Sequence, residues 1–347
     1  MTTSGNNLPK NDMLLEIKDL RVYFELAEGT VRAIDGVDLN IRRGQMLGVV
    51  GESGCGKSMT AMSLMRLIPS PGEIASGEML FYRAKASAAG SSATEVLDLA
   101  KLDPNSKLMR DIRGDQISMV FQEPMTALSP VLSVGYQITE AIRLHRNVSK
   151  DEARELAIDM LDRVRMPNPH KIIDDYPFQL SGGMRQRAVI AMALSCHPSL
   201  LIADEPTTAL DVTTEAQILD LMRELQQELN MAIMYISHNL GVIAEMAEEV
   251  AVMYLGRIVE KTDVQTLFFN PKHPYTQGLL KSIPQLDDFN KGRLETITGV
   301  VPDPYTRLKG CPFHPRCPDF MPGTCDQIEP EIIELQPGHI VRCHLYE

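Results

Sequence analysis

The sequence lacks any uncharged run long enough to cross a membrane. Its longest uncharged stretches cover residues 124–139 and 188–203, and proline interrupts both of them. Neither supplies the roughly 18–20 consecutive apolar residues that a membrane-spanning helix needs. The first dozen residues, MTTSGNNLPKND, are polar and contain no apolar segment of the kind found in secretory signals. We therefore expect a soluble, cytosolic protein.

Basic residues are also scarce relative to acids. The chain has 34 Lys and Arg against 46 Asp and Glu, which gives a net charge of −12. Binding of nucleic acid through a broad surface requires a basic patch, so we expect no nucleic-acid partner. The 347 residues are 44% hydrophobic, which is enough to build a substantial core over about two domains.

Apolar patterning indicates an α/β fold. Strands are expected at residues 14–24, 31–41, 46–50, 115–122, 200–203 and 232–236, and a hairpin at 250–260. Helical spacing is expected at 58–67, 134–165 and 213–229. Alternation of strands with helices implies a parallel sheet, with a helical stretch inserted into it. The small, polar segment 84–94 predicts a flexible hairpin insertion.

A phosphate-binding loop is the first motif that carries chemistry. Residues 51–58 read GESGCGKS and match the pattern G-x-x-x-x-G-K-[ST] between a buried strand and a helix. Glycines let successive backbone N–H groups surround a phosphate, and the helix N-terminus adds positive potential. Lys57 would reach the β- and γ-phosphates, and the Ser58 hydroxyl would bind Mg²⁺. Cys55 is expected to be a small packing residue, with a redox-sensitive thiol as the alternative.

Two acids end a later buried strand. Asp204 and Glu205 follow the apolar run Leu200–Ala203. A carboxylate at such a strand end in a P-loop protein can hold magnesium, and Asp204 suits that role. Glu205 would then orient or deprotonate the attacking water. Without the P-loop, two surface acids would be the better interpretation.

A further set of motifs resembles the ATP-binding-cassette (ABC) ATPases. Residues 180–187, LSGGMRQR, are similar to the LSGGQ-type signature of that family, with Met184 where glutamine is commoner. Gln122 matches the Q-loop, residues 209–211 match the D-loop and His238 matches the switch histidine. Phe24 resembles the aromatic that stacks on adenine, with Tyr23 as the alternative.

The resemblance implies an α/β P-loop NTPase core with a parallel sheet, an N-terminal antiparallel β part and an inserted helical subdomain. It implies that Ser181 and Gly183 serve the γ-phosphate held by a second ATPase subunit, and that His238 holds Glu205 and the water in line. Gln122 would bridge Mg²⁺ and the subdomain that touches the membrane partner. The residues expected to contact ATP are Phe24, Ser53, Gly54, Cys55, Gly56, Lys57, Ser58, Met59, Ser181, Gly183 and Asp211. Those expected around Mg²⁺ are Ser58, Gln122 and Asp204.

Within the family, the chain resembles the ATPase subunits of dipeptide and oligopeptide importers. The segments 121–138, 273–284 and 310–318 carry this likeness. It implies ATP hydrolysis that drives peptide uptake, two membrane permease subunits, an extracytoplasmic solute-binding protein and a second, related ATPase chain. The protein would lie at the cytoplasmic face of the inner membrane. Import of nickel, glutathione or sugar is the alternative, and a soluble non-transport ABC ATPase is a further one.

The resemblance also sets expected domain limits. Residues 1–13 would form a flexible tail, and 14–267 the ABC ATPase domain with its helical subdomain at about 124–185. Residues 268–347 would form a C-terminal extension. Eleven prolines follow Asn270, and the regular apolar periodicity fades there, which agrees with a distinct C-terminal region.

Four of the six cysteines crowd into the last 37 residues, with the spacing C-x5-C-x7-C-x17-C. In a reducing compartment, clustered cysteines are more often metal ligands than disulfides. The spacing lacks the paired C-x2-C of common zinc ribbons. Some members of the resembled family carry a 4Fe–4S cluster, and we expect one here on Cys311, Cys317, Cys325 and Cys343. Zinc, or reduced cysteines that only pack, are the alternatives.

Overall fold

The computed structural model describes residues 12–85, 93–122, 127–208, 210–282 and 297–347. Most of the expected tail 1–13, part of the insertion 84–94, and Ala209 lie outside the described residues. Contacts group the described residues into two units. Unit 1 comprises residues 12–41, 47–101 and 237–347, and unit 2 comprises 42–46 and 102–236. No helix in the described ranges is long and apolar enough to span a membrane.

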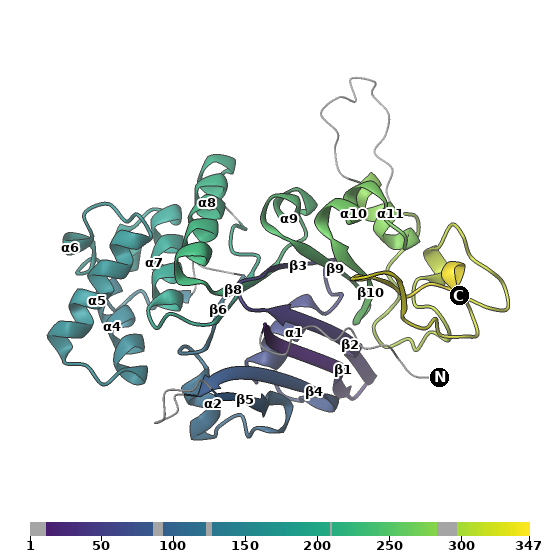
Figure 1. The fold of residues 1–347 in the computed structure, drawn as a ribbon, viewed down its shortest axis with the longest axis horizontal. Helices are drawn as coiled ribbons and strands as arrows, with labels where there is room; N and C mark the ends of the chain where they lie inside the picture. Colours follow the sequence, from purple (N-terminus) through teal and green to yellow (C-terminus); the bar gives the residue numbers. More distant parts are fainter. Residues whose placement is uncertain (1–11, 86–92, 123–126, 209, 283–296) are drawn as a thin grey trace. The chain divides into compact units, whose positions relative to one another are not determined.

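Unit 1 begins with an antiparallel four-stranded sheet (Figure 1). Its strand order is β2-β1-β4-β5, from strands β1 (Met13–Leu26), β2 (Gly29–Arg42), β4 (Gly72–Lys85) and β5 (Ala93–Asp98). Buried apolar side chains such as Leu20 and Val22 in β1 form one face of the sheet's core. This confirms the expected N-terminal antiparallel part.

A second set of strands in unit 1 carries the phosphate-binding loop. The order is β11-β12-β10-β9-β3, where β3 (Met46–Val50) is parallel to β9 (Glu249–Tyr254). The strands β10 (Arg257–Asp263), β12 (His339–Val341) and β11 (Ile333–Gln336) follow in antiparallel order. The last two strands come from the C-terminal extension. The expected C-terminal extension therefore continues the sheet that carries the phosphate-binding loop.

Short helices and turns complete unit 1. They are α1 (Lys57–Leu64), η1 (Leu99–Lys101), α9 (Leu240–Met246), α10 (Val264–Phe269), α11 (Pro274–Lys281), η3 (His314–Arg316) and η4 (His344–Tyr346). Helix α9 lies close to β3, because a side chain at Gly48 would meet Ile243 at 2.8 Å.

Unit 2 is a three-stranded parallel sheet with helices. The order is β8-β7-β6, from β6 (Ile117–Val120), β7 (Leu200–Asp204) and β8 (Ala232–Ile236). The helices and turns are α2 (Lys107–Ile112), α4 (Val134–His145), α5 (Lys150–Arg163), α6 (Pro169–Ile172), η2 (Pro177–Gln179), α7 (Gly182–Leu194) and α8 (Val212–Leu229). Helices α4, α5 and α7 lie side by side in Figure 1. Every residue of the three strands is buried, which explains why their sequences are almost entirely apolar.

Candidate functional site

The phosphate-binding loop joins the buried strand β3 to helix α1 in unit 1. Gly51 and Gly56 have φ of 154° and 106°, and both lie against other backbone. A side chain at Gly51 would lie 2.1 Å from the Met253 carbonyl oxygen, and one at Gly56 2.5 Å from that of Ala33. Only glycine fits at either position, as a loop that curls around a phosphate requires.

The ammonium of Lys57 lies inside this loop. It is buried, and its Nζ donates to the carbonyl oxygens of Gly51 at 2.8 Å and Glu52 at 3.2 Å. Cys55 is also buried, and this burial raises the pKa of its thiol. This burial agrees with the packing role expected for Cys55, which stays a prediction.

Other predicted nucleotide contacts of unit 1 surround the loop or lie on β1. Ser53 and Gly54 are exposed, and Ser58 and Met59 are half-buried at the start of α1. The Phe24 ring packs where a side chain at Gly72 would lie, whereas the Tyr23 hydroxyl donates to Asp35 at 2.6 Å. The two aromatics therefore have different neighbours, and the adenine contact of Phe24 stays a prediction.

His238 lies in the short turn that leads to α9, and its side chain is exposed. The next residue, Asn239, caps α9 by accepting the N–H of Gly241 at 3.0 Å. An imidazole in this position is accessible to a ligand, and its role as the switch histidine stays a prediction.

The predicted catalytic carboxylate lies in unit 2. Glu205 follows β7 with φ of 47°, a left-handed conformation that is strained for a non-glycine residue. Its backbone N–H donates to the Ile236 carbonyl at 2.9 Å, and its carboxylate accepts from Gln122 at 3.1 Å and Thr208 at 3.2 Å. The direct hydrogen bond between Gln122 and Glu205 was not predicted from sequence, and the catalytic roles of both residues stay predictions.

The predicted magnesium ligands are divided between the units. Ser58 belongs to unit 1, whereas Gln122 and the buried Asp204 belong to unit 2. Hydroxyl, amide and carboxylate oxygens are the hard donors that Mg²⁺ prefers. The donor set therefore fits the ion chemically.

The signature and D-loop residues meet in one hollow of unit 2. A space of about 350 Å³ is lined by Ser181, Gly183 and Asp211, among others. Ser181 caps α7 by accepting the N–H of Met184 at 3.3 Å, and Asp211 caps α8 through Thr214 at 3.0 Å. Two helix N-termini thus open at this hollow, which is the arrangement that favours an anion.

One contact of the phosphate-binding loop was not predicted from sequence. Arg316 binds the Glu52 carboxylate with two hydrogen bonds, at 2.7 and 3.0 Å, and the Tyr275 hydroxyl accepts the Glu52 N–H at 2.9 Å. Arg316 and Tyr275 belong to the C-terminal extension. Arg316 is 264 positions from Glu52, so no local pattern could have indicated the pair.

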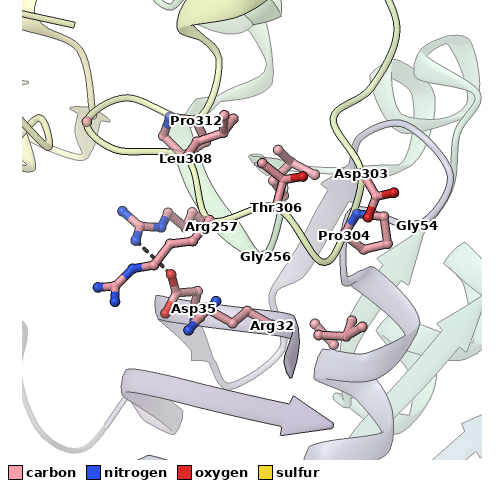
Figure 2. A pocket seen from close by; sticks show the side chains of 15 residues that line it. Arg32, Asp35, Gly54, Gly256, Arg257, Asp303, Pro304, Thr306, Leu308 and Pro312 are labelled. Atoms are coloured by element: carbon pink, nitrogen blue, oxygen red, sulfur yellow. Dashed lines mark hydrogen bonds and ion pairs between the residues drawn. The ribbon is translucent and has the colours of Figure 1, made fainter. Parts of the chain in front are cut away.

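A small pocket lies beside the same loop (Figure 2). It encloses about 160 Å³ between Gly54, the start of β2 and residues 303–312 of the extension. The Arg257 guanidinium donates to Asp35 at 2.7 Å across its wall. The ion pair with Arg257 helps to keep the pKa of Asp35 below its usual value, although burial opposes this.

The four clustered cysteines lie near one another. The Cys311 N–H donates to the Cys325 carbonyl at 2.8 Å. Burial raises the pKa of Cys311 to about 12 and that of Cys317 to about 11. Among the described residues, which include all four cysteines, no three His, Cys, Asp or Glu side chains converge as a metal site requires. The predicted 4Fe–4S cluster therefore has no support among the described residues.

Comparison with known families decides the class of protein. The family described as "ABC transporter" matches residues 34–208. The chain belongs to this family. A second family, "Oligopeptide/dipeptide transporter, C-terminal region", matches residues 259–325 of this ABC protein.

Full-length relatives agree with both matches. The oligopeptide transport ATP-binding protein AppD of Bacillus subtilis is 47% identical over 96% of this chain and 97% of its own length. The dipeptide transport ATP-binding proteins DppD of Bacillus subtilis and Escherichia coli are 44% and 43% identical, and each aligns over 96% of its own length. These alignments cover 97% and 95% of this chain.

Solved ABC cassettes have the same fold. The dimeric ATP-binding cassette MJ0796, in a post-hydrolysis state bound to ADP and Pi, has a TM-score of 0.60 and 25% identity. The match covers 72% of this chain and 99% of that one. CbiO1 from Clostridium perfringens, part of the complex cbiONQ, also has a TM-score of 0.60, with 26% identity over 75% of this chain and 92% of its own. The predicted family and P-loop α/β fold are confirmed, and the chain is an ABC ATPase.

Proposed function

We propose that this ABC ATPase powers the import of di- or oligopeptides through separate membrane permease subunits. The match of residues 259–325 to the C-terminal region of oligopeptide and dipeptide transporters carries the proposal. Relatives named for dipeptide or oligopeptide transport align along nearly the whole chain and support it. No described helix could span a membrane, which agrees with a pore made by other chains.

In this proposal, the phosphate-binding loop holds ATP. Lys57 would leave its carbonyl partners for the β- and γ-phosphates, and the Ser58 hydroxyl, Gln122 and Asp204 would hold Mg²⁺. Magnesium, when bound, would neutralise the charge that develops on the phosphates. Glu205 orients and deprotonates the attacking water, with His238 in support. The hydrogen bond between Gln122 and Glu205 supports a shared role for these two residues.

The proposed assembly has several chains. Ser181, Gly183 and Asp211 would complete the nucleotide site of a second, related ATPase subunit. Two helix N-termini at one hollow of unit 2 support this, because they favour the γ-phosphate of a partner's ATP. A pair of permeases and an extracytoplasmic binding protein would complete the transporter, and this chain would lie at the cytoplasmic face of the inner membrane. Nickel, glutathione or sugar as cargo is not favoured by the relatives above, which are named for peptides.

Uptake of a labelled dipeptide and a labelled tripeptide tests the cargo. Cells that lack this gene, and that keep the genes of the permeases, are complemented with the wild-type chain or with Lys57→Ala. We expect the wild-type chain alone to restore uptake of at least one peptide. Restored uptake of nickel or of a sugar, with no peptide uptake, would contradict the proposed cargo.

A further inference from the structure

An acidic residue lies within the anion-binding loop. Glu52 directly follows Gly51, in the loop whose N–H groups and lysine are to surround the phosphates of ATP. A bare carboxylate there would repel a triphosphate, and this repulsion grows as the surroundings exclude water. Such a loop needs a cation that neutralises Glu52.

The C-terminal extension supplies that cation. The Arg316 side chain is 4% exposed and makes a two-point contact with the Glu52 carboxylate, whose side chain is 28% exposed. Paired hydrogen bonds of this kind fix geometry as well as charge. Among the ion pairs between described residues, this one joins the extension directly to the phosphate-binding loop.

Arg316 is itself held firmly in place. It ends the turn η3, its Nε donates to the Thr298 carbonyl at 3.3 Å, and its guanidinium lies within 6.0 Å of the ring centres of Tyr254 and Phe313. Tyr275, which accepts the Glu52 N–H, contacts the same two rings, with centroids 4.6 and 5.4 Å away. One aromatic cluster therefore supports both contacts with Glu52.

Glu52 also contacts Lys57, the residue predicted to bind phosphate. Its carbonyl oxygen accepts a hydrogen bond from the Lys57 ammonium at 3.2 Å, whereas its N–H donates to the Tyr275 hydroxyl. The carboxylate, the N–H and the carbonyl of Glu52 are thus each held, two of them by the extension. A change in the position of Arg316 would therefore alter both the charge and the shape of the loop.

We propose that Arg316 is a positioning residue for nucleotide binding, which neutralises Glu52 and fixes the phosphate-binding loop from the C-terminal extension. The inference rests on the ATP binding proposed above and gives the extension a role at the ATP site. Arg316 does not need to touch the nucleotide, because it acts through Glu52.

The test measures the affinity of the purified full-length chain for ATP, ADP and adenosine, by titration calorimetry. For Arg316→Gln we expect the Kd for ATP to rise about tenfold, which corresponds to roughly 1.4 kcal/mol. The rise should be smaller for ADP and absent for adenosine, because the unpaired carboxylate repels phosphate charge. In the assembled transporter, KM for ATP should rise while kcat stays within about twofold.

A second substitution separates charge from simple loss of structure. The double variant R316Q/E52Q leaves no unpaired charge, so its ATP affinity should return to within about threefold of wild type. Arg83→Gln is the matched control, because Arg83 makes a similar two-atom contact with Glu95, at 2.7 Å, elsewhere in unit 1. That variant should bind ATP like the wild type.

Three results would overturn the inference: unchanged ATP affinity in R316Q, an equal loss for adenosine, or no recovery in a folded R316Q/E52Q. If R316Q does not fold, Arg316→Lys replaces it, since it keeps the charge and loses the two-point contact. Its Kd for ATP should rise about threefold, because the charge remains and only the two-point geometry is lost, and equality with wild type would overturn the inference. A wild-type chain that binds no ATP would overturn the proposed function as well.

Discussion

The Lys57 ammonium is already oriented inside the loop by the carbonyl groups of Gly51 and Glu52. It therefore needs only to exchange neutral acceptors for charged phosphate oxygens when ATP binds. Hydrogen bonds to charged groups contribute more than neutral ones, about 1.5–3 kcal/mol each. The residue predicted from sequence to bind phosphate is thus placed by its own loop.

Replacement of this lysine should weaken nucleotide binding itself. For Lys57→Ala we expect the Kd for ATP to rise about 10- to 100-fold, from the loss of one such charged contact. Calorimetric titration of the full-length chain measures the change. Lys101→Ala, at a side chain that is 73% exposed, is the control and should bind ATP normally. Equal affinity of the K57A and K101A variants would remove Lys57 from the site.

His273 makes the stability of the extension depend on pH. It is buried, its Nδ1 accepts the Tyr275 N–H at 3.1 Å, and burial lowers its pKa from 6.5 to about 3. The unfolded chain takes up a proton below about pH 6.5, whereas the folded chain stays neutral there. The folded state should thus lose stability as pH falls from 6.5 towards 3, by up to about 1.4 kcal/mol per pH unit.

Urea unfolding between pH 7.5 and pH 4.5 measures this dependence. His273→Gln removes the titrating ring, so its unfolding midpoint should fall less steeply with acidification than that of wild type. The exposed His170→Gln is the control and should follow the wild-type curve. The explanation fails if H273Q and wild type lose stability in parallel.

At the scale of secondary structure, the contact between α7 and α8 depends on one glycine. A side chain at Gly183 would approach the Thr214 methyl to 2.8 Å, and Thr214 cannot rotate away without losing its 2.7 Å bond to Asp211. Gly182 is a suitable comparison, because its nearest neighbour would be Leu210 at 3.9 Å. The second glycine of the signature is therefore required by packing, whatever its role with nucleotide.

Substitution of Gly183 tests this packing, and substitution of its neighbour Gly182 is the control. Gly183→Ala should reduce the free energy of unfolding by about 1–2 kcal/mol, from overpacking against a stiff side chain. Gly182→Ala should leave it unchanged or slightly raised, because alanine favours a helix. Urea denaturation of both variants measures the difference, and identical curves would show that the helices adjust without cost.

Strands with an uninterrupted apolar sequence were predictable from the sequence, whereas strands with a broken or very short pattern were not. The strands Met46–Val50 and Ala232–Ile236 have the predicted limits, because full burial demands continuous apolar residues. The strand β4 was missed: Gly77, with φ of 105°, interrupts its alternation, and its pairing with β1 shifts register near Arg21. The strands β11 and β12 are three or four residues long, too short for a period to show.

At the scale of the whole molecule, local motifs identified the ATPase but not the contact between the extension and the P-loop. The loop around Lys57, the signature at Ser181 and the carboxylate of Glu205 each lie in a short segment with its own pattern. The pair of Glu52 and Arg316 depends on tertiary folding across most of the chain. The four cysteines were predictable as a group from their spacing, whereas the burial that raises the pKa of Cys311 is not visible in that spacing.

We propose that this chain hydrolyses ATP to drive peptide import, with Glu205 as the residue that activates water. The most direct measurement is ATP hydrolysis by the complete purified transporter, with and without peptide-loaded binding protein, for wild type and Glu205→Gln. We predict hydrolysis stimulated by peptide in wild type. In the E205Q variant we predict at least a 100-fold slower rate with ATP still bound, since a positioned base contributes about 10²–10⁴-fold. A normal rate in the E205Q variant would contradict the proposed role of Glu205, and a wild-type hydrolysis rate that does not change with peptide would contradict the proposed coupling to import.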